Sequence, residues 1–214
     1  MIFPPPELAS EEGLLAVGGD LSVERLVLAY SRGIFPWYGP GDPILWWSPD
    51  PRLILEPAGM HVPGRLARTI RQGVFQVTFN TSFPEVIKAC ASTPRRGQVG
   101  TWIGEEMIEA YQRLYETGYV YSVESWQKGE LVGGLYGVCL GKVFFGESMF
   151  SLVSDSSKVA LAHLARWLQD WNFDMIDCQM KTEHLMRLGA REITGREFRQ
   201  RLTRSVRPSF DDRI

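Results

Sequence analysis

The middle of the chain constrains the fold most, because strand-like segments follow one another at short intervals there. Segments 119–126, 131–140 and 143–147 are rich in β-branched and aromatic residues, and the turns Lys-Gly-Glu and Gly-Lys separate them. This spacing predicts an antiparallel meander. A helical pattern at 156–171 and another strand-like segment at 173–179 come next. The last strand is therefore expected to join the sheet of the meander.

A meander, a long helix and a further strand, in that order, are typical of an acetyltransferase-like (GNAT-like) domain. We expect an α+β protein whose C-terminal domain, residues 61–214, has a mainly antiparallel sheet flanked by helices. The remaining patterns predict a strand at 75–79 and helices at 64–72, 83–91, 105–116, 182–188 and 196–203.

The first 60 residues have a different organisation, because proline and glycine interrupt them repeatedly around one helical pattern at 22–31. Ser22 suits the N-cap of that helix, and Gly33 lies where a helix often ends. We expect a small, loop-rich N-terminal domain over residues 1–60, whose helix packs on the second domain.

Charge, cysteine content and hydropathy limit the function classes. Twenty-three basic against 25 acidic residues leave a net charge of −2, so nucleic-acid binding would require a local basic patch. The three cysteines show no CxxC spacing, which argues against a disulfide framework and a zinc site. The N-terminus has no signal-peptide pattern, and no run of about 18 apolar residues occurs. A cytoplasmic location is expected.

A carboxylate and an amide close the strand at 173–179. If the strand alternates regularly, Asp177 and Gln179 lie on one face and Cys178 lies on the other. Such a pair can orient a reacting group and share a proton, although an amide alone is a poor base. On these residues alone, a capped strand end or a surface salt bridge is the more frequent explanation.

A second acidic residue, Glu147, directly follows the apolar segment that contains Phe144 and Phe145. A carboxylate among apolar side chains needs a partner or a cationic substrate. Composition alone favours pairing with an internal arginine, so the functional interpretation depends on context.

Tryptophans and arginines supply possible nucleic-acid contacts. Trp37, Trp46, Trp47 and Trp102 lie near turns, where their rings could stack on bases or line a pocket, although at least two would ordinarily belong to the core. Neighbours in an extended segment face opposite ways, so one of Trp46 and Trp47 is expected to be structural.

A basic stripe is expected on the helix at 64–72, where Arg65, Arg68 and Arg71 recur at three-residue spacing. Arg95 and Arg96 follow farther along the chain. Such a stripe is more often a solvated face than an RNA site, so its interpretation also needs a reason to expect RNA.

Seven strings, in one order from about Phe3 to Phe198, resemble the leucyl/phenylalanyl-tRNA–protein transferase family. The strings are GLLAVGGDLS, LAYSRGIFPWYGPGDPILWWSPDPR, GTWI, LVGGLYGV, FFGESMFS, SSKVAL and IDCQ. The resemblance implies a cytoplasmic enzyme with an acetyltransferase-like domain and without metal or organic cofactor. Such enzymes transfer leucine or phenylalanine, and less readily methionine, from aminoacyl-tRNA to proteins beginning with lysine or arginine, which creates an N-degron.

The resemblance also implies a site. Its GESMF glutamate is Glu147, its DCQ residues are the catalytic candidates Asp177 and Gln179, and its TWI tryptophan, Trp102, would help hold the terminal adenosine of the tRNA. We expect the two carboxylates to form a negative region that attracts a cationic N-terminus. The apolar pocket for the transferred side chain would contain Leu135, Phe144, Met149 and Ile176, with Trp46 or Trp47 at its border. Arg65, Arg68 and Arg71 would contact tRNA phosphates, because one enzyme must accept several tRNAs.

Two rival classes are weighed against this interpretation. An acetyl-CoA-dependent N-acyltransferase would share the fold, but the approach to its long helix usually carries a glycine-rich loop, whereas SLVSDSSK contains no glycine. A non-catalytic tRNA-binding protein would bind without reacting, and the presence of Glu147, Asp177 and Gln179 argues against it.

Overall fold

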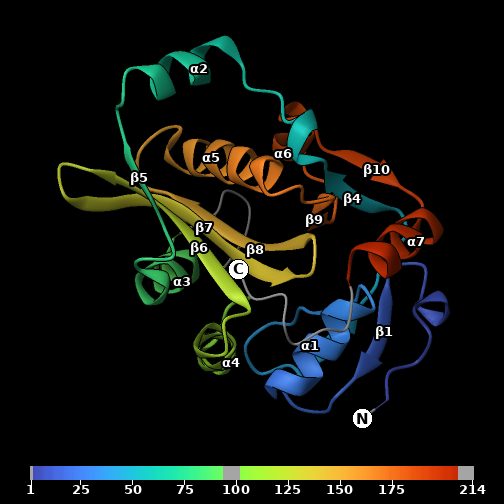
Figure 1. Cartoon of the computed structure of the whole chain (residues 1–214). Helices are drawn as coiled ribbons and strands as arrows, with labels where there is room; N and C mark the ends of the chain where they lie inside the picture. The colour runs from blue at the N-terminus through green and yellow to red at the C-terminus, as the bar shows by residue number, and fades with distance from the viewer. Residues whose placement is uncertain (1, 94–101, 207–214) are drawn as a thin grey trace.

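A computed structural model describes residues 2–93 and 102–206, which contain a larger and a smaller sheet (Figure 1). The strands of the larger sheet are β4 (Arg52–Leu55), β5 (Gln76–Phe79), β6 (Val120–Gln127), β7 (Glu130–Leu140), β8 (Val143–Ser151), β9 (Met175–Gln179) and β10 (Arg191–Ile193). Their spatial order is β10-β4-β9-β8-β7-β6-β5. Neighbours pair antiparallel except β8 and β9, which are parallel. The expected α+β class and mainly antiparallel sheet are confirmed.

The predicted meander is formed by β6, β7 and β8. Lys128 and Gly129 both have positive φ angles, 54° and 82°, as a two-residue hairpin turn between twisted strands requires. Strand β8 is longer than the expected segment 143–147, because it continues to Ser151 beside β7. Glu147 therefore lies inside a strand instead of at its end.

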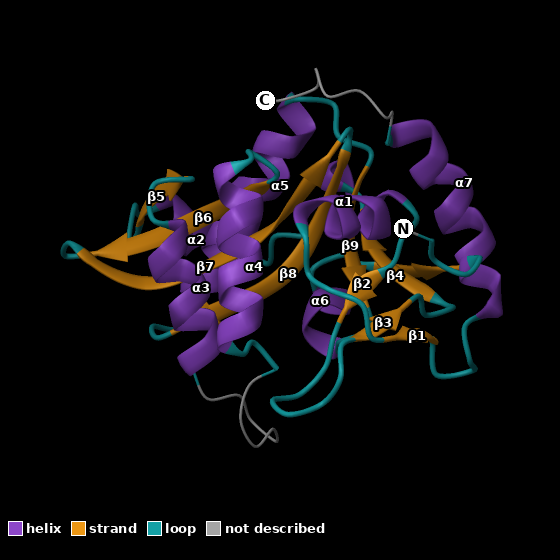
Figure 2. Ribbon diagram, turned by 90° about the horizontal axis from the view of Figure 1, so that it is seen from below, coloured by secondary structure: helices purple, strands orange, loops and turns teal. Residues whose placement is uncertain are grey.

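Helices cover both faces of the meander (Figures 1 and 2). One face carries α2 (Gly64–Arg71) and α5 (Ser156–Asp170), and the other carries α3 (Phe83–Ser92) and α4 (Glu105–Glu116). Successive strand residues enter different cores, since Leu135 packs with the α5 side and Tyr136 with the α3 and α4 side. This period-two alternation agrees with the expected sheet flanked by helices, because each face of the sheet packs against its own hydrophobic core.

The N-terminal segment contributes α1 (Val23–Ser31) and a small sheet of order β1-β3-β2, formed by β1 (Leu14–Val17), β2 (Phe35–Pro36) and β3 (Leu45–Trp47). Gly33 has a φ of +74° just after the helix, as expected for its end. Helix α1 contacts α4 and β7. Its predicted packing on the rest of the protein is confirmed.

The boundary expected at residue 60 does not coincide with the change of sheet. Strand β4 already belongs to the larger sheet, so the change falls between Trp47 and Arg52. Tertiary pairing decides this point, because β4 is a short segment between prolines with no distinctive pattern of its own. The division into two domains stays a prediction.

The chain closes with two capped helices. Thr182 caps α6 (Glu183–Arg187), and Thr194 caps α7 (Gly195–Ser205), each through a side-chain oxygen that accepts a backbone N–H. Two short 3-10 helices, Pro6–Leu8 and Pro57–Gly59, complete the described elements. None of the described helices is long and apolar enough to cross a membrane.

Candidate active site

Strands β8 and β9 separate in the middle of the larger sheet. They pair in parallel from Val143 and Met175 to Phe145 and Asp177, after which β8 continues beside β7 and β9 beside β4. A bulge in β8 lies at the same level, because Gly146 and Ser148 face consecutive residues of β7 and Glu147 is the extra residue between them. The bulge places Glu147 at the opening between the two strands.

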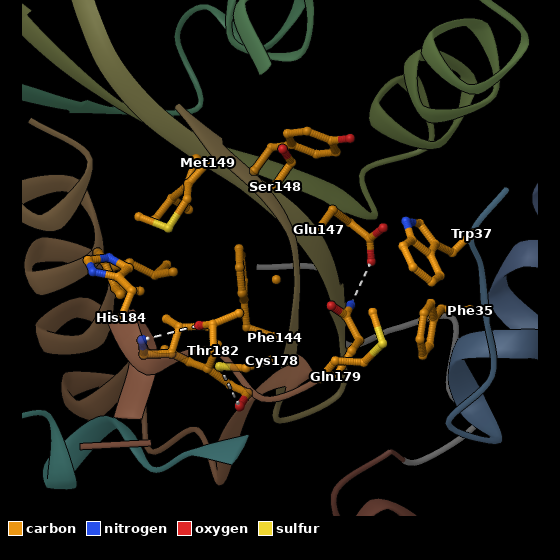
Figure 3. Close-up of a pocket in the computed structure, with 18 of the residues that line it drawn as sticks. Phe35, Trp37, Phe144, Glu147, Ser148, Met149, Cys178, Gln179, Thr182 and His184 are labelled. Carbon is orange, nitrogen blue, oxygen red and sulfur yellow. Dashed lines mark hydrogen bonds between the residues drawn. The ribbon is translucent and has the colours of Figure 1, made fainter. Parts of the chain in front are cut away.

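A cavity of about 460 Å³ occupies this opening (Figure 3). Its lining residues are Phe35, Pro36, Trp37, Trp102, Leu135, Tyr136, Phe144, Gly146, Glu147, Ser148, Met149, Leu161, Leu164, Ile176, Cys178, Gln179, Met180, Thr182, His184 and Leu185. Figure 3 shows Glu147, Gln179 and Trp37 toward one end and Met149 and His184 toward the other. An apolar cleft with a few convergent polar groups is the usual form of a small-ligand site.

Seven of the residues predicted for the site line this one cavity. They are Trp102, Leu135, Phe144, Glu147, Met149, Ile176 and Gln179. The fold thus brings together positions from four separate strings of the sequence. Their placement supports a common site, whereas the role of each side chain stays a prediction.

Glu147 is hydrogen-bonded to neutral partners. The Tyr111 hydroxyl donates to its Oε2 at 2.8 Å, and Nε2 of Gln179 donates to its Oε1 at 3.3 Å. No salt bridge joins Glu147 to a basic side chain among residues 2–93 and 102–206, so pairing with an internal arginine is not observed. Burial raises the pKa of Glu147 to about 7, against the opposing effect of the Tyr111 and Tyr30 hydroxyls. Near neutral pH this carboxyl can therefore gain or lose a proton.

Two buried tyrosines form a hydrogen-bonded chain that ends at the Glu147 carboxyl. The hydroxyls of Tyr30 on α1 and Tyr111 on α4 are hydrogen-bonded to each other. Burial, reinforced by the nearby charge of Glu147, raises the pKa of both phenols well above the usual value. Both hydroxyls therefore stay protonated and serve as hydrogen-bond donors.

Asp177 lies on the opposite side of β9, away from the cavity. Its carboxylate is buried and forms a bidentate salt bridge with Arg52, with Nε to Oδ1 at 2.8 Å and Nη2 to Oδ2 at 2.6 Å. The prediction that Asp177 and Gln179 share a face through regular alternation is wrong. Gln179 has a φ of +58°, so the strand leaves its extended path at this residue.

This position changes the expected charge of the site. The backbone N–H of Gln179 donates to Oδ1 of Asp177 at 3.0 Å, so Asp177 is linked by a hydrogen bond to a residue that lines the cavity. Because Arg52 balances the Asp177 charge, the predicted negative region made by two carboxylates is wrong, and Glu147 supplies the carboxylate of the cavity wall.

Trp46 has a structural position. Its side chain is 1% exposed, contacts the Phe3 ring edge-on at 4.9 Å, and donates from Nε1 to the Gly18 carbonyl at 2.8 Å. The prediction that Trp46 borders the pocket is therefore wrong. Trp37 lines the cavity instead, and Trp47 supports it with a ring contact at 5.6 Å and an Nε1–H bond to the Trp37 carbonyl.

Several lining residues were not predicted from the sequence. Leu161 and Leu164 come from the inner face of α5, where their three-residue spacing was the only available signal. Cys178 lines the cavity, but burial raises its pKa, so the thiol stays protonated and is a poor nucleophile. Burial, together with the charges of Lys158 and Arg187, lowers the pKa of His184.

The basic stripe lies on α2, outside the cavity. Arg65, Arg68 and Arg71 are exposed, and Nε of Arg65 lies 3.8 Å from Oδ2 of Asp155 near the start of α5. Exposed cations are compatible with phosphate binding and equally with a solvated face, so tRNA contact stays a prediction here. Arg95 and Arg96 lie outside the described residues.

An antiparallel meander, a long helix and a parallel strand that separates from the meander define an α+β protein of acetyltransferase-like fold, with an apolar pocket at the separation. The family model "Leucyl/phenylalanyl-tRNA protein transferase" matches residues 54–203, and the model of its N-terminal domain matches residues 19–50. The chain belongs to the leucyl/phenylalanyl-tRNA protein transferase family.

Individual relatives cover almost the whole chain. The transferase of Anaeromyxobacter sp. (strain Fw109-5) is 57% identical over 99% of this chain and 90% of its own length. That of Nitrosospira multiformis is 58% identical over 96% of this chain and 89% of its own length. Both relatives are named leucyl/phenylalanyl-tRNA–protein transferase.

Solved structures are more distant. The L-PGS of Bacillus licheniformis matches at 12% identity with a TM-score of 0.41, over 73% of this chain and 51% of that one. A GCN5-related N-acetyltransferase of Kribbella flavida matches at 14% identity with a TM-score of 0.39, over 76% and 57%. At these scores the similarities carry no functional argument.

Proposed function

We propose that this chain transfers leucine or phenylalanine, and less readily methionine, from aminoacyl-tRNA to the N-terminal lysine or arginine of acceptor proteins in the cytoplasm. The product would be an N-degron that marks the acceptor for proteolysis. Family membership supports the reaction, and the cavity at the separation of β8 and β9 is the observation that carries it. There, Glu147 and Gln179 lie at one end of a cavity that is otherwise lined mostly by apolar side chains.

The reaction needs little covalent chemistry from the protein. An aminoacyl ester is already activated, and an α-amino group with a pKa near 8 is partly unprotonated at neutral pH. The amine nitrogen forms a bond to the ester carbonyl carbon, the carbon–oxygen bond to the ribose breaks, and the ribose hydroxyl leaves with a proton. The site must align the two groups and help that proton to move.

Glu147 and Gln179 suit the acceptor side of this reaction. Nε2 of Gln179 donates to Glu147, and the Gln179 Oε1 is the acceptor atom of the same amide, which can accept an N–H from the attacking amine. The Glu147 carboxylate supplies the charge that attracts a cationic N-terminus. In this proposal Gln179 is the catalytic residue, and Asp177 acts as a positioning residue through the Gln179 backbone.

The donor side uses the apolar part of the cavity. Leu135, Phe144, Met149 and Ile176 would surround the transferred side chain, and the rings of Trp102 and Trp37 would hold the terminal adenosine. Such a pocket discriminates by shape at about 1–3 kcal/mol per methylene-sized mismatch. Side chains branched at Cβ, such as valine and isoleucine, should therefore be poor substrates.

The test incubates the protein with radiolabelled Leu-tRNA or Phe-tRNA and a model protein that begins with arginine. Acetyl-CoA is present as the competing donor, and Val-tRNA replaces Leu-tRNA in a parallel reaction. The proposal expects leucine or phenylalanine at the acceptor N-terminus and little valine. An acetylated acceptor, or equal transfer from Leu-tRNA and Val-tRNA, would contradict it.

A further inference from the structure

Arg52 is the first residue of β4, and its side chain is buried at the junction of three elements. It is 1% exposed, and its guanidinium carbon lies 4.9 Å from the ring centre of Phe35 and 4.5 Å from that of Phe198. Phe35 belongs to β2 and lines the cavity, whereas Phe198 belongs to α7. The guanidinium is thus fixed between two rings while its edge faces Asp177.

The strand register at this point has a local irregularity. Leu53 faces Gln179 and Ile54 faces Asp177, so Cys178 is the extra residue of β9. Immediately after it, Gln179 adopts the left-handed conformation that residues other than glycine rarely adopt. The Gln179 N–H donates to Asp177 Oδ1, which forms an Asx turn over residues 177–179. In such turns an aspartate side chain accepts a hydrogen bond from the backbone N–H two residues farther along the chain.

The same oxygen therefore serves two partners, the Gln179 backbone and Nε of Arg52. A buried carboxylate without a compensating cation is strongly unfavourable, and a single point contact would not hold both of its oxygens. The guanidinium fork fixes both, which determines the direction in which Oδ1 faces Gln179.

We propose that Arg52 is a positioning residue for the transfer reaction. Arg52 holds Asp177 in the orientation that fixes Gln179 in its left-handed conformation. In that conformation the Gln179 amide is presented to Glu147 and to the substrate amine. This inference rests on the proposed function. The competing explanation is structural, in which Arg52 only anchors β2 and α7 to β4.

A double-mutant cycle separates the two explanations. Arg52→Lys keeps the charge but removes the fork, and Gln179→Ala removes the side chain that Arg52 is proposed to position. Each variant and the double variant are measured for melting temperature, Phe-tRNA affinity and single-turnover transfer to a peptide that begins with arginine. Arg201→Lys is the matched control, because Arg201 forms a similar pair with Asp174 at the other end of β9, with Nη2 to Oδ1 at 2.7 Å.

The proposal expects Arg52→Lys to slow single turnover at least about tenfold, with Phe-tRNA affinity unchanged within about twofold. In the Gln179→Ala background the same substitution should have no further effect on the rate. Arg201→Lys should change stability alone. Equal losses from Arg52→Lys with and without the Gln179 side chain would overturn the proposal, as would a parent-like rate in the single variant.

If Arg52→Lys does not fold, the pair Arg52→Met and Asp177→Asn replaces it, since removing both buried charges together is often tolerated. Its rate loss should likewise disappear in the Gln179→Ala background, and an additive loss would overturn the proposal. A parent protein that transfers neither phenylalanine nor leucine would refute the proposed function together with this inference. A parent that transfers either amino acid, combined with additive losses, would refute the role of Arg52 alone.

Discussion

Nε2 of Gln179 on β9 donates a hydrogen bond to Oε1 of Glu147 on β8 at 3.3 Å, at the level where the two strands have already separated. The bulge at Glu147 and the left-handed conformation of Gln179 both contribute to this contact. Two local departures from regular strand geometry thus bring these side chains together at one end of the cavity, where a substrate amine could contact both.

Glu147→Gln should weaken the selection of cationic acceptors. The substitution preserves shape and removes the charge that attracts an N-terminal arginine, so the preference for arginine-initiated over alanine-initiated peptides should fall about fivefold, equivalent to ~1 kcal/mol. Competition between the two peptides at pH 8 measures this ratio. Glu116→Gln, an exposed acidic position on α4, is the control. An unchanged ratio in Glu147→Gln would remove Glu147 from acceptor recognition.

The same variant should change how stability depends on pH. The Glu147 pKa is about 7 because of burial, above its ordinary value of 4.5, so the protonated form favours folding. That contribution is complete below pH 4.5 and is lost as the pH rises through 7. The melting temperature of Glu147→Gln should therefore rise relative to that of the parent between pH 5 and pH 8. Parallel melting curves at all pH values would contradict the raised pKa.

The three tryptophans should separate into two groups. Trp37→Ala and Trp102→Ala should each weaken aminoacyl-tRNA binding, since stacking on a base contributes about 1–3 kcal/mol. Trp46→Ala should instead lower stability by about 3–5 kcal/mol, because its ring is buried. Binding titrations and thermal melts on the three variants test this, and stable Trp46→Ala protein with weakened tRNA binding would reverse the assignment.

Alanine at Arg65, Arg68 and Arg71 should raise the Michaelis constant for every donor tRNA alike, because phosphate contacts carry little sequence information. Each lost contact should reduce the log–log salt slope of binding by roughly 0.7–0.9. Arg166→Ala, an exposed arginine paired with Asp170 on α5, is the matched control. An unchanged slope in the triple variant would assign the stripe to a solvated face.

Long, strongly patterned elements could be predicted from the sequence. Apart from the end of β8, the strands of the meander, α4 and α5 are predicted close to their observed bounds, because alternation and helical periodicity extend over many residues there. The strands β1–β4 and β10 were not predicted. They are two to four residues long and stand among prolines and glycines, so their pairing depends on tertiary contacts instead of local pattern.

The site shows the same limit. Motif resemblance identified Glu147, Gln179 and Trp102, but regular alternation wrongly placed Asp177 and Gln179 on one face, because it takes no account of the left-handed Gln179. The sequence does not assign Trp37 to the site, since its position in the cavity wall depends on how the N-terminal segment packs. The partnership of Arg52 with Asp177 joins residues 125 positions apart, and no local pattern indicates it.

Single-turnover transfer by Gln179→Ala tests the central claim most directly. With saturating Leu-tRNA and a peptide beginning with arginine, the parent should add one leucine to the peptide N-terminus. Gln179→Ala should lower the rate at least about tenfold, or ~1.4 kcal/mol, with tRNA affinity and melting temperature unchanged. Adding Asp177→Asn should slow it little further. Transfer by Gln179→Ala at the parent rate, or a loss explained entirely by weaker tRNA binding, would contradict catalysis at the separation of β8 and β9.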